Sequence, residues 1–426
     1  MKFSARLAAL LSACALGAVS TAWAAPPPAS KGMGGKDFET AFDARIDPAE
    51  MGGWLKLLAA EPNNVGSPHD KANAEWVAAQ FKAWGWDTKI EVFDILNPTP
   101  ISQTLELVSG PGAPFKATLA EPPVAGDEAT NTKTALPAYV AYQGDGDVTA
   151  PLVYVNYGMP ADYDALARMG VSVKGKIAIA RYGAGWRGLK PKLAQEHGAV
   201  GAIIYSDPRD DGYSTDDVYP KGPARPAHGV QRGAVMDLPV QPGDPLTPGI
   251  GSTKGAKRLT RAEATSILKI PVLPLSYADA QVLLAALDGP VAPIGWQGSL
   301  PITYHVGPSA QVHLAVKSDW KQTLIYDVIA TMKGSERPDE WIVRGNHRDG
   351  WVMGASDPLS GQIAMLAEAK AFGALAKTGW KPKRTLVYTS WDAEETGRIG
   401  STEWAETHAD ELKAKNVPYT LATIDL

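Results

Sequence analysis

Apolar residues follow two different periods along this chain, and together they predict an α/β fold. In residues 70–84 apolar side chains recur three and four positions apart, as on one face of a helix, and a strand pattern follows at 88–93. Residues 359–377 form a second helical pattern, and residues 384–390 are a nearly unbroken apolar run. Such a run is typical of a strand buried on both faces. We therefore expect helices packed against a central sheet.

The middle of the chain, residues 98–318, has a different pattern that predicts a β-rich domain. One helical pattern occurs at 189–197, and residues 207–253 are rich in Gly, Pro and Asp, which predicts long loops. Short apolar runs predict buried strands at residues 152–155, 176–180 and 202–205. We therefore expect one α/β domain, formed by residues 37–97 and 319–426, that is interrupted by this insert.

Length and composition restrict the class of protein. A chain of 426 residues is long enough for two or more domains. Its hydrophobic content of 45% is ordinary for a globular protein, and 42 Gly and 34 Pro agree with many turns. The formal net charge of −5 argues against a nucleic-acid partner.

The N-terminal segment resembles an export signal. Residues 1–24 combine a basic start, an apolar stretch too short to span a membrane and a small-x-small cleavage site. We therefore expect a periplasmic or secreted protein, in which residues 25–36 form a flexible leader. An alternative is a lipoprotein signal, because Leu-Ser-Ala-Cys14 fits a lipid-attachment box. No later segment predicts a transmembrane helix.

Cysteine usage limits the chemistry that is available. Cys14 is the only cysteine, and cleavage after Ala24 would remove it. Disulfides and thiolate chemistry are then excluded from the mature chain. Any bound metal must be held by His, Asp and Glu.

A histidine and several carboxylates follow the two predicted strands near the C-terminal end. His347 lies just after a strand pattern at 340–345, and the spacing H-x-D-x7-D adds Asp349 and Asp357. Imidazole and carboxylate groups are zinc ligands, and Asp349 is placed to orient the histidine ring. Open α/β sheets place their sites at such strand ends. Taken alone, Asp357 could instead be the N-cap of the helix that follows.

The adjacent pair Glu394 and Glu395 follows the apolar strand at 384–390. Two neighbouring carboxylates repel each other unless a proton or cation lies between them. The alternative for any single Glu-Glu pair is a solvated loop. The histidine motif and the D-A-E-E-x-G motif together favour a metal site.

These motifs resemble a known family of zinc exopeptidases. The segments H-R-D-x-W-V-x-G-x-x-D-P-x-S-G and S-W-D-A-E-E-x-G-x-x-G-S-T-E-W-A-E are similar to the glutamate carboxypeptidase II branch, which includes the transferrin receptors. The insert resembles the protease-associated domain of that family at residues 152–157, 175–183, 230–233, 243–249 and 296–300. The resemblance implies an α/β/α sandwich that is interrupted by a β-rich protease-associated domain and followed by a helical dimerisation domain.

The resemblance also implies roles for individual residues. Asp357 would bridge two zinc ions, His347 would bind one of them and Glu395 the other. Glu394 would be the general base that takes a proton from water. Transferrin receptors have lost these ligands, so their presence here favours an enzyme.

Further residues match positions that bind other groups in the family. Thr247, Glu403 and Glu406 match a structural calcium site between the insert and the peptidase domain, and oxygen ligands suit calcium. The two glutamates could otherwise be exposed helix residues. Arg187 matches an arginine that binds the substrate's terminal carboxylate, with a surface ion pair as the alternative. Ala234 stands where these carboxypeptidases carry an Asn, which puts recognition of a C-terminal glutamate in doubt.

The family's remaining metal ligands fall beyond this chain. A further Asp follows a strand in the pattern I-N-x-D, but Asp425 takes the Asn position, so that Asp and a later His would come after Leu426. Each zinc would keep two of its three protein ligands, and we expect the 426-residue chain by itself to be inactive. The helical domain through which the full-length family forms homodimers also falls beyond Leu426. A strand is expected at 419–426.

The sequence therefore predicts an exported two-zinc exopeptidase that acts on small peptides, with carboxypeptidase-like specificity. An aminopeptidase with the same chemistry is the near alternative. A non-catalytic, receptor-like binding protein is an alternative of a different class.

Overall fold

A computed structural model describes residues 35–415 of this chain. The predicted export signal, most of the predicted leader and the predicted strand at 419–426 lie outside the described residues. Within the described part, no helix combines the length and apolarity that crossing a bilayer requires.

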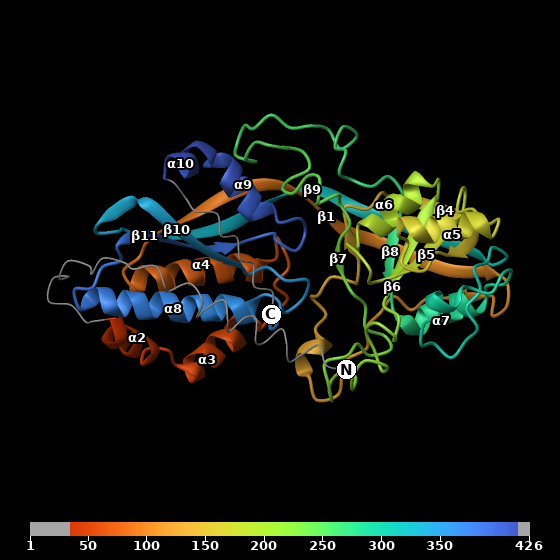
Figure 1. Ribbon diagram of the computed structural model, residues 1–426, viewed down its shortest axis with the longest axis horizontal. Coiled ribbons are helices and arrows are strands. Elements are labelled where there is room, and N and C mark those ends of the chain that lie inside the picture. The colour runs from red at the N-terminus through yellow and green to blue at the C-terminus, as the bar shows by residue number, and fades with distance from the viewer. Residues whose placement is uncertain (1–34, 416–426) are drawn as a thin grey trace, which may run out of the picture.

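Two long strands form the axis of the molecule (Figure 1). β1 (Asp87–Ser109) and β9 (Gln311–Met332) pair antiparallel over almost their whole length, with register shifts near Pro100 and Leu107. The strand predicted at 88–93 is the beginning of β1. Both predicted insert boundaries, at 97/98 and 318/319, fall inside these continuous strands. The insert and the α/β half therefore share one twisted ribbon of backbone hydrogen bonds.

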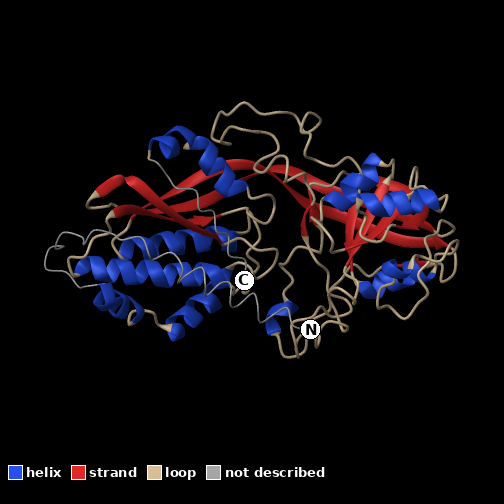
Figure 2. Ribbon diagram, viewed as in Figure 1, coloured by secondary structure: helices blue, strands red, loops and turns tan. Residues whose placement is uncertain are grey.

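The α/β half extends the sheet from one end of this ribbon. β11 (Arg384–Trp391) pairs antiparallel with β9, and β10 (Arg337–His347) pairs parallel with β11. Figures 1 and 2 show helices on both faces of this part of the sheet. One face carries α2 (Gly35–Asp43), α3 (Pro48–Leu58), α4 (Pro68–Ala83) and α8 (Leu359–Lys377), and the other carries α9 (Ile399–Thr407) and α10 (Ala409–Ala414). The predicted α/β layering is confirmed.

Local sequence explains where these helices begin and which faces they bury. The hydroxyl of Ser67 accepts a hydrogen bond from the Asp70 main-chain N–H at 3.1 Å and caps α4, and Pro68 occupies the first turn. The predicted apolar face of α4 is buried against β1 and β9. α8 spans the predicted residues 359–377. Its buried residues pack against β11 through Tyr388.

The insert forms the other end of the sheet and contains more helix than its sequence predicts. Its four parallel strands are β4 (Gly146–Tyr154), β5 (Ile177–Arg181), β6 (Gly201–Tyr205) and β8 (Val272–Leu275). The predicted helix is α6 (Leu189–Glu196), but α5 (Pro160–Arg168) and α7 (Tyr277–Ala285) are present as well. The sequence prediction of one helix was therefore wrong. α7 lacked a signal because it is mostly apolar, so that no polar face alternates with an apolar one.

Short elements complete the insert. β2 (Phe115–Lys116) pairs with β1, and β3 (Val140–Ala141) pairs with β7 (Gly233–Ala234). Two 3-10 turns are η1 (Glu128–Asn131) and η2 (Ile294–Trp296). Residues 207–253 are long loops apart from β7, as their Gly and Pro content predicts.

Candidate metal and catalytic site

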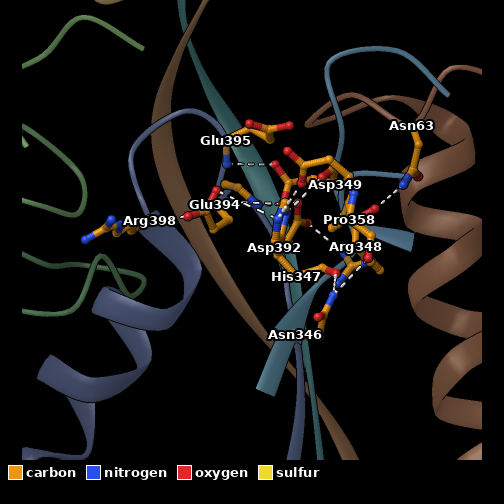
Figure 3. Close-up of polar contacts among 12 residues, drawn as sticks. Asn63, Asn346, His347, Arg348, Asp349, Pro358, Asp392, Glu394, Glu395 and Arg398 are labelled. Atoms are coloured by element: carbon orange, nitrogen blue, oxygen red, sulfur yellow. Dashed lines mark hydrogen bonds and ion pairs between the residues drawn. The ribbon is translucent and has the colours of Figure 1, made fainter. Parts of the chain in front are cut away.

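The candidate site lies where β10 and β11 end side by side. The two strands are parallel, and His347, the last residue of β10, is paired with Trp391, the last residue of β11. The loops that follow both strands therefore leave the sheet at the same edge. One loop carries Asp349 and Asp357, and the other carries Glu394 and Glu395 (Figure 3 labels all but Asp357).

The His347 ring is held with one nitrogen facing carboxylates. Its side chain is 4% exposed. Nδ1 lies 3.0 Å from the main-chain carbonyl oxygen of Asp349 and 3.5 Å from its Oδ1. Nε2 lies 3.3 Å from Asp357 Oδ1 and 3.9 Å from Glu394 Oε2. If Nδ1–H donates to Asp349, the Nε2 lone pair is directed at the carboxylates, which is the arrangement of a metal-ligating imidazole. The ring is therefore oriented mainly by the main chain of Asp349, although the sequence suggested its side chain.

The electrostatics of this pocket favour a cation. Burial lowers the pKa of His347, but the hydrogen bonds with Asp349 and Asp357 raise it well above the ordinary value. Burial raises the pKa of Glu395 well above its usual range, and the carboxylates of Asp349 and Asp357 raise it further. Negative charge thus exceeds positive charge at the strand ends, and a divalent cation would compensate it.

Asp357 does not cap the helix that follows it. The N-cap of α8 is Pro358, without a side-chain hydrogen bond, so the alternative of an Asp357 cap is not what the structure shows. The Asp357 side chain is 62% exposed and points to His347. The hydrogen bond with His347 lowers the pKa of Asp357 although burial opposes it, and the charge of Arg187 also lowers it.

Asp349 fixes the main chain of the Glu394–Glu395 pair. Its Oδ1 accepts the Glu394 N–H at 3.0 Å, and its Oδ2 accepts the Glu395 N–H at 3.2 Å. The Glu394 side chain is 22% exposed, and its Oε1 lies 3.8 Å from Arg398 Nε. The Oε2 atom of Glu395 accepts a hydrogen bond from the Trp351 indole at 2.8 Å. The pair is thus partly enclosed, in contrast to a solvated loop.

The donor set fits zinc by its chemistry. One imidazole nitrogen and several carboxylate oxygens are the ligands that zinc takes in cysteine-free sites. The structure brings His347, Asp357 and Glu394 together around Nε2, whereas Glu395 is turned toward Trp351. Within residues 35–415 no three His, Cys, Asp or Glu side chains are gathered closely enough to enclose a metal ion by themselves.

The residues predicted to bind calcium join the insert to α9. Glu403 is fully buried and accepts the Asp244 and Ser252 main-chain N–H groups at 2.7 and 2.6 Å, so it is not an exposed helix residue. Thr247 donates its hydroxyl to Asp244 Oδ2 at 3.0 Å. Glu406 Oε1 accepts the Gly249 N–H at 2.9 Å, and its buried Oε2 finds no hydrogen-bond donor among the described residues.

The charge at this junction suits a cation. Burial raises the pKa of Glu403 to about 7 and also raises the pKa of Asp244 and of Glu406. Arg258 lies 3.2 Å from Asp244 Oδ2 and compensates one of these carboxylates. Asp244 lies in the segment 243–249 that carries the resemblance but received no role, and Arg258 belongs to none of the motifs.

Arg187, the candidate residue for binding the substrate's carboxylate, belongs to the insert. Its guanidinium lies over the Trp186 ring at 5.0 Å and packs against Gly233, where an added Cβ would overlap it. Ala234 follows in β7, is fully buried and pairs with Ala141 of β3. The positive charge of Arg187 contributes to the lowered pKa of Asp357, so the two side chains interact electrostatically.

Three buried charges beside the site have no counterpart in the sequence prediction. Arg348 stands between His347 and Asp349, and its guanidinium contacts Asp392 and Asp70. Arg348 and Asp392 belong to the motifs but received no role. Asp70 lies far away in the sequence on α4, so only the folded structure connects it to the site.

Comparison with known proteins identifies the class. Residues 148–238 match the PA domain, and residues 327–421 match peptidase family M28. A crystal structure of a peptidase M28 precursor from Shewanella amazonensis SB2B has the same fold, with a TM-score of 0.54 at 20% identity over 89% of this chain and 72% of that one. The chain belongs to the M28 family of zinc metallopeptidases and carries a PA domain.

Sequence relatives place it within one branch of this family. It is 42% identical over 395 residues to a probable glutamate carboxypeptidase of Arthroderma benhamiae, covering 90% of this chain and 54% of the relative. It is 34% identical over 396 residues to the aminopeptidase NAALADL1 of Rattus norvegicus, covering 88% and 52%. The resemblance found in the sequence is confirmed, and the chain spans about half the length of the curated relatives it matches.

Proposed function

We propose that this protein is a two-zinc exopeptidase that hydrolyses small peptides with carboxypeptidase-like specificity. The proposal is carried by the His347 imidazole, whose Nε2 faces Asp357 and Glu394 at 3.3 and 3.9 Å at the end of two parallel strands. The similarity to a probable glutamate carboxypeptidase of Arthroderma benhamiae supports the carboxypeptidase assignment.

The side chains of the site have separate roles in this proposal. His347, Asp357 and Glu395 would hold the metal, with Asp357 shared between two ions. Zinc, when bound, supplies Lewis-acid chemistry that polarises a peptide carbonyl and acidifies water. Glu394 accepts the proton of the attacking water and returns it to the departing amine. Asp349 holds the main chain of Glu394 in place for this transfer.

Arg187 binds the free carboxylate of the substrate in this proposal. A guanidinium group offers two parallel donors to a carboxylate. Arg187 is supplied by the insert, and its positive charge lowers the pKa of Asp357. An exopeptidase that reads this group would remove residues from the C-terminal end.

We also propose a structural calcium ion held by Thr247, Glu403 and Glu406. The buried Glu406 Oε2, without a donor among the described residues, supports this assignment. Oxygen-only ligation suits calcium. The ion would hold the insert loop at 243–258 against α9. It would thereby fix the position of the insert, which carries Arg187, relative to the zinc ligands.

The aminopeptidase alternative is favoured by one sequence feature and one relative. Ala234 replaces the Asn expected beside a carboxypeptidase's terminal-carboxylate site, and the rat relative is named an aminopeptidase. The test compares the cleavage of N-acetylated and C-amidated dipeptides by the full-length protein, with zinc counted by mass spectrometry. Cleavage of only the N-acetylated peptide supports the carboxypeptidase, and cleavage of only the C-amidated peptide supports the aminopeptidase. Protein without zinc or cleavage would be a receptor-like binding module.

Export and self-association belong to the same proposal. Residues 1–24 support transfer to the periplasm or beyond, and the resemblance supports a homodimer of the full-length protein. Cell fractionation tests the first, and light scattering tests the second. Protein that stays in the cytoplasm, or remains monomeric at full length, would reject these two assignments.

A further inference from the structure

Arg348 is a buried cation beside the candidate metal ligands, and its guanidinium contacts Asp392, Asp70 and the Ser390 carbonyl. It lies between His347 and Asp349 in sequence, and its side chain has no exposed surface. Its Nη2 lies 2.8 Å from Asp392 Oδ2 and 3.2 Å from Asp70 Oδ1, and both carboxylates are fully buried. Its Nη1 donates to the Ser390 carbonyl at 3.2 Å. One guanidinium thus links three separate segments of the chain (Figure 3 shows Arg348 and Asp392).

The main chain of Arg348 is fixed as well. Its N–H donates to the Trp391 carbonyl at 3.0 Å, and its own carbonyl accepts a hydrogen bond from the Asn63 side chain. Asn63 also donates its N–H to the Val352 carbonyl at 2.7 Å and accepts the Gly350 N–H at 2.9 Å. The loop that carries His347 is therefore held against the segment that precedes α4.

Asp392 transfers this constraint to the second loop. Its Oδ1 accepts the Ala393 N–H at 2.7 Å, its Oδ2 accepts the Tyr326 N–H at 2.8 Å, and its own N–H donates to Asp327 Oδ1 at 2.8 Å. Ala393 has a φ of 54°, a left-handed conformation that is unusual for a residue with a Cβ. Glu394 and Glu395 follow this turn, with Glu394 Oε2 3.9 Å from His347 Nε2 and Glu395 Oε2 bound to the Trp351 indole.

We propose that Arg348 is a positioning residue: its guanidinium, bound to Asp392 and Asp70, sets the relative placement of the two loops that carry the zinc ligands and the general base. This inference rests on the proposed two-zinc function. Lysine cannot replace it, because a single ammonium group lacks the planar fork that reaches two carboxylates and a carbonyl together. Supporting groups of this kind are worth about 10- to 100-fold in metal affinity.

A buried arginine in the insert provides the matched control. Arg181 also has no exposed surface, and it contacts Asn156 and Asp210 far from the strand-end site. Arg348→Lys and Arg181→Lys therefore make the same chemical change in two buried polar networks. Only the first network is joined to the metal-ligand loops.

The experiment measures zinc affinity by competition with a chromophoric chelator and amide hydrogen exchange by mass spectrometry, both on the purified full-length protein. We expect Arg348→Lys to weaken zinc binding about 10- to 100-fold and to speed exchange about tenfold in peptides that cover 347–358 and 392–398. Arg181→Lys should leave both readouts of the site unchanged. Unchanged exchange in those peptides, or an equal effect of Arg181→Lys on them, would overturn the proposal.

The two readouts separate this inference from the proposed function. If the wild-type chain binds no zinc, the two-zinc proposal fails, and the exchange of the two loops still decides the role of Arg348. If zinc binds and Arg348→Lys retains full affinity, the positioning role fails while the two-zinc proposal stands. The lysine variant is used because it retains the positive charge between the buried carboxylates of Asp70 and Asp392.

Discussion

The side chain of Asp349 binds the main chain of Glu394: Oδ1 of Asp349 accepts the Glu394 N–H at 3.0 Å. The same residue presents its carbonyl oxygen to His347 Nδ1 at the same distance. Asp349 therefore sets both the orientation of the candidate imidazole ligand and the main-chain position of the candidate general base. Both contacts are made within the protein itself. They hold the His347 ring and the Glu394 main chain in place before a metal ion or substrate binds, which is the preorganisation that catalysis requires.

Glu394→Gln separates proton transfer from metal binding. The amide retains the shape of the side chain but cannot accept the proton of water, so kcat of the full-length protein should fall about 100- to 10,000-fold. Zinc content should remain at the wild-type level, because His347, Asp357 and Glu395 are intact. Peptide hydrolysis and elemental analysis of the same samples provide the measurement. Glu39→Gln on the exposed side of α2 is the control and should change neither. Retained turnover would exclude Glu394 as the base.

Calcium should stabilise the protein through Glu403 and Glu406. An ion present at about 100 times its Kd adds about 3 kcal/mol to the free energy of unfolding. We therefore expect calcium to raise Tm in the wild type and to lose this effect in Glu406→Gln, which removes the charge at the buried Oε2. Differential scanning fluorimetry with calcium, magnesium or chelator measures the shift. Glu75→Gln, on the exposed side of α4, should respond like the wild type. A wild-type Tm that ignores calcium would reject the site.

The helices and strands could be predicted where the spacing of apolar residues matches the side chains that are buried. α8 begins and ends at the predicted residues, and α4 and β11 lie where their apolar patterns indicate. α7 escaped prediction because its residues are mostly apolar, which removes the helical signal. The extent of β1 also escaped, because its pairing with β9 depends on contacts more than 200 residues apart.

Only those residues of the site that belong to locally spaced motifs could be predicted from the sequence. His347, Asp357 and Glu394 were singled out by motif, and the structure places them around Nε2 of the histidine. The contact between Arg348 and Asp70 had no sequence signal, since a charge on a helix normally suggests a solvated face. Glu403 was singled out by the resemblance, but its full burial against main-chain donors of the insert had no local sequence signal.

His313 should make stability depend on pH. It lies on β9, with Nδ1 3.3 Å from Glu106 on β1 and Nε2 2.9 Å from Asp147 on β4, and Lys116 on β2 is 3.1 Å from the same Glu106. The hydrogen bonds with Asp147 and Glu106 raise the pKa of His313 above its ordinary 6.5. The folded state thus binds this proton more tightly, so the stabilisation is fully present below pH 6.5 and is lost as pH rises through the raised value.

Urea unfolding between about pH 5 and pH 9 measures this dependence. His313→Gln should flatten the decline in unfolding free energy above pH 6.5. His305→Gln, in the insert, removes a histidine whose ring contacts the Gly289 main-chain carbonyl and should preserve the wild-type slope. Identical slopes for the wild type and His313→Gln would contradict the three-strand contact.

Gly233→Ala should displace Arg187 without unfolding the insert. A Cβ at position 233 would overlap the guanidinium and the Cδ of Arg187, which form the flexible end of a side chain and can move away. Loss of a charged hydrogen bond of about 1.5–3 kcal/mol corresponds to a rise in KM of about 10- to 100-fold for peptides with a free C-terminus. Hydrolysis kinetics of the full-length protein measure this rise in KM, and kcat should change little. Tm should fall somewhat, because Gly233 has a φ of 158° that a residue with a Cβ rarely adopts. Gly52→Ala, where an added Cβ meets open space on α3, is the matched control. If Gly233→Ala binds such peptides as the wild type does, Arg187 does not hold their terminal carboxylate from its position against Gly233.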